Sequence, residues 1–161
     1  MSEIKLINTP LEIGLRTLII LDAISPDVID LDRLVIYDYL ILHTGDVLKC
    51  EDSLHPPTPH RSGELFVRRQ LIQDGLELME SRELLKKSFE EEGIVYSANT
   101  LTGPFLRYFE TDYSHKLKSK SNWVKLHFKD YSNNQLKEYI RNNVDRWGGE
   151  FVNESFLRRE I

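Results

Sequence analysis

Cysteine is almost absent from this chain of 161 residues, because Cys50 is the only one. No intrachain disulfide can form, so the fold must be stabilised by a packed core. A single cysteine and an N-terminus without a signal-peptide pattern favour a reducing compartment, and we expect a cytoplasmic protein. The longest apolar run, residues 15–21, contains Arg16. A membrane span needs roughly 18 apolar residues, so we expect no membrane contact.

The sequence also lacks the short signatures of common enzymes. It contains neither of the glycine-rich phosphate loops, Gly-x-x-x-x-Gly-Lys-Ser/Thr and Gly-x-Gly-x-x-Gly, and no Gly-x-Ser-x-Gly turn for a nucleophile. Ligand types for zinc are present at Cys50, His55 and His60, with His43 as a fourth, but their spacing matches no recognised site. We therefore predict no metal, cofactor or catalytic site, and we predict that the protein is not an enzyme. A zinc site is the alternative interpretation of these four residues.

Charge is distributed unevenly along the chain. Residues 1–112 hold 11 Lys/Arg and 20 Asp/Glu, a net charge of −9, whereas residues 113–161 hold 10 Lys/Arg and 6 Asp/Glu, a net charge of +4. An acidic first part and a basic second part indicate two surfaces that face different partners. Chance clustering on solvated helix faces is the alternative.

Apolar spacing predicts three helices in the first half of the chain. The first begins at Thr9-Pro10, where Thr9 caps and Pro10 takes the first helical position, and it ends before Pro26. Asp30 caps a second helix over 31–43, which places Asp38 on its apolar face and makes Gly45 the residue after its C-terminus. A third helix covers 62–82, where Gly75 is a weak point at which the helix can kink.

The spacing then changes to that of strands. Residues 84–89 and 94–98 predict a β-hairpin, with Gly93 supplying a positive φ in its short loop. Helix resumes at Gly103-Pro104, and a further helix covers 133–147. We therefore predict a mainly α protein with a small β-hairpin: a winged helix-turn-helix core over 1–102, followed by a C-terminal helical extension over 103–161. A three-helix bundle with an incidental hairpin is the alternative.

The segment between the second and third helices is rich in proline. Residues 53–61 read Ser-Leu-His-Pro-Pro-Thr-Pro-His-Arg. Each proline fixes its own φ and keeps the preceding residue extended, so a loop of this composition loses little entropy on binding. We predict that this loop and nearby arginines, whose planar guanidiniums pair well with carboxylates, dock a protein partner. The predicted partner-binding residues are His55, Pro56, Pro57, Pro59, His60, Arg61, Arg68 and Arg69.

A winged helix often reads DNA with its third helix, but the charges here oppose that. Residues 62–82 hold three arginines and four carboxylates, a net charge of −1, and the hairpin loop carries Glu90, Glu91 and Glu92. Phosphates are held by cations, so we expect this module to bind protein. The basic segment 113–129 interleaves lysines with aromatics, a pattern that can contact nucleic acid, although an amphipathic helix with buried aromatics is the alternative. The possible nucleic-acid contacts are Lys116, Lys118, Lys120 and Lys125.

Several stretches resemble a known family. They are 8–16, Asp32-Arg33-Leu34, Asp38-Tyr39-Leu40 and His43-Thr44-Gly45-Asp46, then most strongly 53–65 with Val67-Arg68-Arg69, and finally Gly75-Leu76 with Glu92-Gly93-Ile94. On these residues the chain resembles the middle components of bacterial ABC three-component systems, in particular the type found in Lamassu anti-phage defence.

The resemblance implies a small, non-catalytic subunit with a winged-helix core. Such a subunit is encoded between an SMC-like ABC ATPase and an effector, often a nuclease. It attaches to the ATPase heads and helps to hold the effector inactive until foreign DNA is sensed. The expected partners are therefore these two proteins, with DNA reached mainly through the complex. A DNA-binding winged-helix transcriptional regulator is the alternative function.

Overall fold

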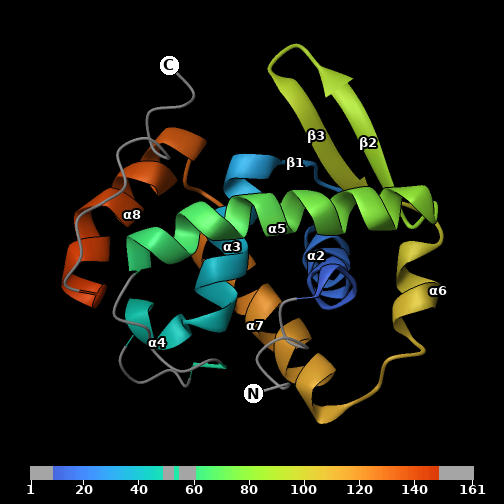
Figure 1. Ribbon diagram of the computed structural model, residues 1–161, viewed down its shortest axis with the longest axis horizontal. Coiled ribbons are helices and arrows are strands. Elements are labelled where there is room, and N and C mark those ends of the chain that lie inside the picture. Colours follow the sequence, from blue (N-terminus) through green and yellow to red (C-terminus); the bar gives the residue numbers. More distant parts are fainter. Residues whose placement is uncertain (1–8, 49–52, 55–60, 149–161) are drawn as a thin grey trace.

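The computed structural model describes residues 9–48, 53–54 and 61–148, without the side chains of residues 46, 61–66 and 144–148. It is mainly helical with one small antiparallel sheet, as predicted from the sequence (Figure 1). The elements follow the chain in this order: α2 (Pro10–Ile24), β1 (Ile29–Asp30), α3 (Leu31–Leu42), α4 (Thr44–Val47), α5 (Arg61–Ser81), β2 (Leu85–Glu90), β3 (Gly93–Ala98), α6 (Thr102–Leu106), α7 (Asp112–Phe128) and α8 (Asn133–Gly148).

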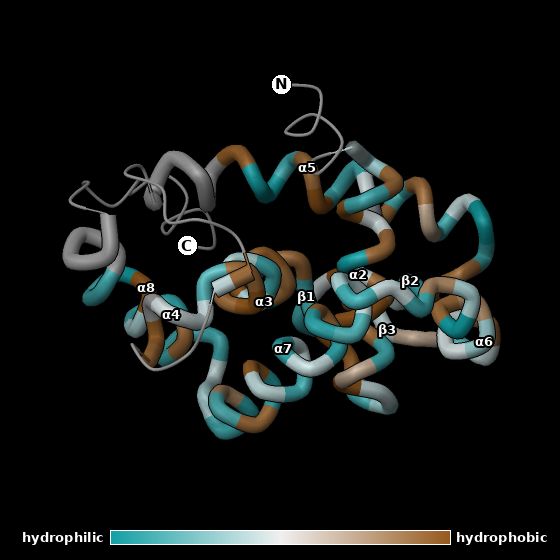
Figure 2. The backbone as a smooth tube through the Cα atoms, turned by 90° about the horizontal axis from the view of Figure 1, so that it is seen from below, coloured by the Kyte–Doolittle hydropathy of each residue, from teal (hydrophilic) through white to brown (hydrophobic). Residues whose placement is uncertain are grey.

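Helices α2 and α3 supply most of the hydrophobic core. Their N-termini are capped as predicted: Thr9 Oγ1 accepts a hydrogen bond from the Glu12 amide at 3.2 Å, and Asp30 accepts one from the Arg33 amide at 2.8 Å. In Figure 2, α3 is largely hydrophobic and lies between α5 on one side and α7 on the other. A helix covered on several sides needs apolar residues nearly all round, which both sequences have.

Helix α5 crosses α2 at a pair of glycines. A Cβ atom on Gly75 would lie 2.9 Å from the Gly14 amide nitrogen and 3.1 Å from Ile13 Cγ2. Gly75 therefore allows two backbones to approach closely. Gly75, where the sequence predicts a weak point in the third helix, is the residue at which α5 crosses α2. Helix α5 itself runs without interruption from Arg61 to Ser81.

The predicted hairpin is confirmed and forms part of a three-stranded sheet of order β1-β3-β2. Strands β2 and β3 pair from Leu85↔Ala98 to Glu90↔Gly93, and Gly93 has φ +129°. Strand β1 pairs with β3 only at Tyr96 and Val95, so the outer half of the hairpin extends beyond the third strand and projects from the helices (Figure 1). The winged helix-turn-helix assignment stays a prediction.

Two local boundaries differ from the sequence prediction. Gly45 does not follow the end of the second helix: α3 ends at Leu42, His43 follows it, and Gly45 lies inside the short helix α4. The helix that resumes at Gly103-Pro104 is short, since α6 ends at Leu106, and a separate helix α7 begins after Thr111, whose hydroxyl accepts a hydrogen bond from the Ser114 amide at 3.1 Å. At the second boundary the capping hydroxyl of Thr111 fixes where α7 begins.

The helices after residue 102 share a core with those before it. Leu106, Leu117, Val124, Phe128, Leu136 and Ile140 belong to the same buried cluster as the side chains of α2 and α3. Helix α7 packs on both α2 and α3, and α8 packs on α3 and α5. The predicted boundary at residue 102 thus separates two stretches of sequence that pack around one core. Among the described residues, none of the helices combines the length and hydropathy that crossing a membrane requires.

Candidate functional site

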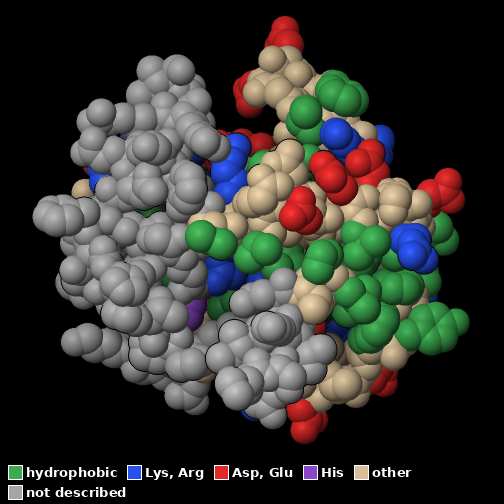
Figure 3. All heavy atoms as spheres, in the orientation of Figure 1, with side chains coloured by type: hydrophobic (Ala, Val, Ile, Leu, Met, Phe, Trp, Pro, Cys, Tyr) green, Lys and Arg blue, Asp and Glu red, His purple; other side chains and the backbone are tan. Residues whose placement is uncertain are grey.

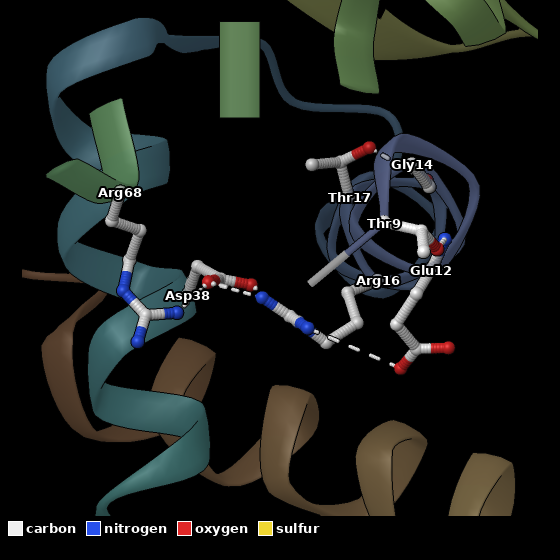
Figure 4. A network of polar contacts seen from close by, with 7 residues as sticks. All are labelled: Thr9, Glu12, Gly14, Arg16, Thr17, Asp38 and Arg68. Carbon is white, nitrogen blue, oxygen red and sulfur yellow. Dashed lines mark hydrogen bonds and ion pairs between the residues drawn. The ribbon is translucent and has the colours of Figure 1, made fainter. Parts of the chain in front are cut away.

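Three charged side chains meet in the interior where α2, α3 and α5 converge (Figure 4). Asp38 of α3 accepts two hydrogen bonds from Arg16 of α2, with Nε to Oδ1 and Nη2 to Oδ2 both at 3.0 Å. Arg68 of α5 donates to Asp38 Oδ2 from the other side. The side chain of Asp38 is 1% exposed and that of Arg16 is 2% exposed. One carboxylate thus joins two guanidiniums that come from different helices.

This cluster is held in its charged form. Burial alone would raise the pKa of Asp38, but Arg16 and Arg68 together lower that pKa to about 2. Burial also opposes the charge of Arg16, and Asp38 outweighs it, so the pKa of Arg16 is raised. Glu12 lies 4.0 Å from Arg16 at the half-buried edge of the cluster, where burial raises its pKa. Burial likewise raises the pKa of Tyr113 to about 12. The arrangement is suited to fixing three helices relative to one another.

A second polar cluster attaches α8 to the core. Asp32 of α3 forms ion pairs with Arg69 of α5 and with Lys137 of α8, the latter at 3.3 Å. One turn away, Asn133 at the start of α8 donates to Asp30 at 2.7 Å and accepts from Arg33 at 2.9 Å. Helix α8 is therefore bound to the N-cap residue and the first turn of α3.

The structure places the predicted docking arginines in these two clusters. Arg68 is 9% exposed and faces Asp38, and Arg69 is half-buried and faces Asp32. Their role in partner binding stays a prediction, since the contacts observed are internal ones. His55, Pro56, Pro57, Pro59 and His60 lie outside the described residues, as does the side chain of Arg61.

The outer face of α5 is consequently poor in cations. Among its described side chains, those exposed before the final residue are Val67, Gln70, Gln73, Asp74 and Glu77. The two arginines that could contact phosphates from the middle of this helix are turned inward. Over residues 67–80, α5 therefore presents carboxylates and no exposed cation, whereas phosphate contacts are made mainly by cations.

The four predicted nucleic-acid lysines are divided between two sides of α7. Lys116 and Lys120 are four residues apart and share one side, whereas Lys118 and Lys125 are seven apart and share another, about 200° around the helix. The buried residues Leu117, Ser121, Val124 and Phe128 lie between the two sides. The predicted basic segment therefore does not form one continuous stripe of lysines.

Lys125 belongs to an open hollow of about 450 Å³ beside the turn between α2 and β1. Its ammonium donates to the Ala23 carbonyl at 2.9 Å, near the C-terminus of α2, and Arg33 donates to the Phe128 carbonyl at 2.9 Å, at the C-terminus of α7. Cations at helix C-termini stabilise the exposed carbonyls there. The hollow is lined by Ile24, Asp27, Val28, Ile29, Arg33, Tyr37, Lys125, Lys129, Tyr131 and Asn133.

The zinc alternative lies mostly outside the described residues. Cys50, His55 and His60 are not described, and His43 is 2% exposed with its ring 4.8 Å from that of Tyr39. Within the described part of the chain, no group of three or more His, Cys, Asp and Glu side chains is placed to hold a metal ion.

Comparison with known proteins decides the family. Residues 6–150 match the family described as ABC-three component (ABC-3C) system Middle Component 2. The chain belongs to this family. No curated protein and no solved structure shows a significant match to it. A middle component works with the other components of its system, so this ABC-3C middle component is expected to present surfaces for protein partners.

Helical spacing predicts Asp38 on an apolar helix face, but it does not predict the pairing of Asp38 with Arg16 and Arg68. A signal was present, because Arg16 also lies within an otherwise apolar helix and buried charges occur in compensating groups. The partner on α5 could not be chosen from sequence, since Arg61, Arg68 and Arg69 were equivalent candidates until the helix was placed.

Proposed function

We propose that this ABC-3C middle component is a non-catalytic accessory subunit of a Lamassu-type defence complex. It joins an SMC-like ABC ATPase to an effector, a nuclease, and helps to restrain that effector until foreign DNA is sensed. DNA reaches the chain mainly through the ATPase. The family match over residues 6–150 is the observation that carries this proposal, together with the resemblance of residues 53–65 to the Lamassu type.

Two features of the structure support a role in protein assembly. The charged groups at the centre of the fold, Arg16, Asp38 and Arg68, are used to hold helices together. The described outer face of α5 carries the carboxylates Asp74 and Glu77, which repel phosphates, and before the final residue none of its described exposed side chains is a cation. A transcriptional regulator with the same order of helices and strands would need cations on that face.

The test is co-expression of the chain with the ATPase and the effector encoded beside it. We expect a stable complex that contains all three proteins, and an effector whose nuclease activity is low in the complex and rises when this subunit is omitted. The purified chain alone should not turn over ATP or DNA. It should also not bind a duplex at low salt in a fluorescence anisotropy titration.

Two results would contradict the proposal. One is a chain that purifies apart from both neighbours under every salt condition. The other is tight, sequence-dependent binding of the isolated chain to duplex DNA, which would favour the regulator.

A further inference from the structure

The outer half of the β-hairpin carries an apolar face that nothing in the described structure covers. Leu85, Lys87 and Phe89 of β2 lie opposite Ala98, Tyr96 and Ile94 of β3, so these six side chains share one face of the hairpin. At the base this face is buried, with Leu85 4% and Tyr96 8% exposed. Towards the tip it emerges into solvent, where Phe89 is 77% and Ile94 is 42% exposed.

Phe89 and Ile94 are direct cross-strand neighbours. An aromatic beside a β-branched side chain is a favourable pair on a sheet, and together they form a compact apolar surface. The pair lies beyond the last residue that β1 covers, so it continues the buried face of the hairpin past the point where the described part of the chain covers it. Exposed apolar patches with a polar rim mark interaction sites.

The rim of this apolar pair is acidic. Glu90, Glu91 and Glu92 follow Phe89 directly, and all three are exposed. On the other side of the pair, α5 carries Glu77 and Glu80 next to Tyr96: burial raises the pKa of Tyr96, and Glu80 and Glu77 raise it further. Figure 3 shows acidic side chains at the tip of the hairpin and along α5, with hydrophobic side chains on the hairpin between them.

A cation already uses this surface. Lys87 Nζ lies 5.8 Å from the centre of the Phe89 ring, a cation–π contact within the chain, and Phe89 is still 77% exposed, so most of its surface remains accessible to a partner. Lys86 and Lys87 are the two lysines of β2, against Glu90, Glu91 and Glu92 at the tip and Glu77 and Glu80 near Tyr96. The surface therefore attracts cations in addition to apolar side chains.

We propose that the Phe89–Ile94 face docks a basic, amphipathic segment of a partner component, with an apolar anchor on the pair and Lys or Arg residues against Glu77, Glu80 and Glu90–Glu92. This inference rests on the proposed function, since it assumes that the partner is another protein of the system. Charge excludes nucleic acid as the occupant, because the rim would repel phosphates.

The experiment measures affinity between the full-length chain and the purified ATPase or effector by biolayer interferometry. Phe89→Thr with Ile94→Thr removes the apolar pair and keeps good strand-forming residues. We expect affinity for one component to fall about 30-fold or more, the loss typical of anchor residues at an interface. Leu126→Thr is the matched control, because Leu126 is 64% exposed on α7, away from the hairpin, and should leave affinity unchanged.

A second variant tests the charge. Glu90→Gln, Glu91→Gln and Glu92→Gln together should lower the association rate about tenfold at low salt, with a much smaller effect at about 0.5 M salt, where charges are screened. Circular dichroism melting establishes that all variants are folded.

Each outcome decides the matter. If the wild-type chain binds a component and both the double Thr variant and the triple Gln variant bind it with the wild-type affinity, the hairpin inference is wrong and the proposed function is unaffected. Wild-type chain that binds neither component overturns both. If instead the chain self-associates, and the double Thr variant loses self-association but binds the components unchanged, the face contacts a second copy of the chain and the inference is also wrong.

Discussion

Replacing Gly75 by alanine tests whether helix propensity or tertiary packing dominates where α5 crosses α2. In the interior of a helix, alanine is favoured over glycine by about 1 kcal/mol. On propensity alone, Gly75→Ala should therefore raise the free energy of unfolding.

The geometry of the crossing reverses the expected sign. The new Cβ would lie 2.9 Å from the Gly14 nitrogen, 3.1 Å from Ile13 Cγ2 and 3.3 Å from Gly14 Cα. Two of these atoms belong to the backbone of α2, so no side-chain rotation relieves the contact and the two helices must move apart. Overpacking of this kind costs about 1–3 kcal/mol, and the separation also loosens contacts along α2 and α5. Because the propensity gain of about 1 kcal/mol offsets part of this cost, we expect a net loss of up to about 2 kcal/mol.

Thermal and urea unfolding measure this loss. For a chain of this size, 1 kcal/mol corresponds to about 2–4 °C in melting temperature. Gln73→Ala on the same helix is the control, because Gln73 is exposed and alanine has a slightly higher helix propensity. It should be neutral or slightly stabilising. If Gly75→Ala stabilises the protein as much as the control does, the close approach of α2 and α5 is wrong.

Three further predictions concern stability. Asp38→Asn removes the carboxylate that pairs with the buried guanidiniums of Arg16 and Arg68, and should cost about 3–5 kcal/mol at neutral pH in urea unfolding. The pKa of Asp38 is 3.8 in the unfolded chain and about 2 in the folded protein, so its ionisation stabilises the fold by about 2 kcal/mol above pH ~4. This stabilisation is lost as the pH falls towards 2, so the difference in unfolding free energy between wild type and Asp38→Asn should shrink over that range. A difference that stays constant down to pH 2 would refute the lowered pKa of Asp38. Glu83 follows α5 with φ 60°, so Glu83→Gly should raise stability by about 1 kcal/mol, whereas Glu91→Gly, in the hairpin loop without a positive φ, should not. Asn133→Ala removes the hydrogen bonds that link α8 to Asp30 and Arg33, and should lower the free energy of unfolding by about 1–3 kcal/mol. Amide hydrogen exchange should become faster in α8 than in α2. Equal acceleration in both helices would show that α8 does not open separately.

Short-range features of the sequence determined most of the elements. The caps at Thr9 and Asp30, the stop before Pro26 and the change of apolar spacing at residue 84 each act within a few residues, and all were interpreted correctly. The hairpin follows from its strand-like residues and from Gly93, whose backbone conformation few other residues adopt. The family resemblance likewise depends on sequence alone and agrees with the match over residues 6–150.

Interactions between distant residues were decided only by the tertiary structure. The partners of Asp38 lie 22 and 30 residues away, and one of several similar arginines was selected by the placement of α5. The same is true of Gly75, whose role depends on facing Gly14 from another helix, and of the four lysines, which helix geometry divides between two sides of α7. Residue types and spacing specify what a short segment prefers, whereas the pairing of charges and the approach of two backbones depend on how segments pack, which becomes known only when the whole core is assembled.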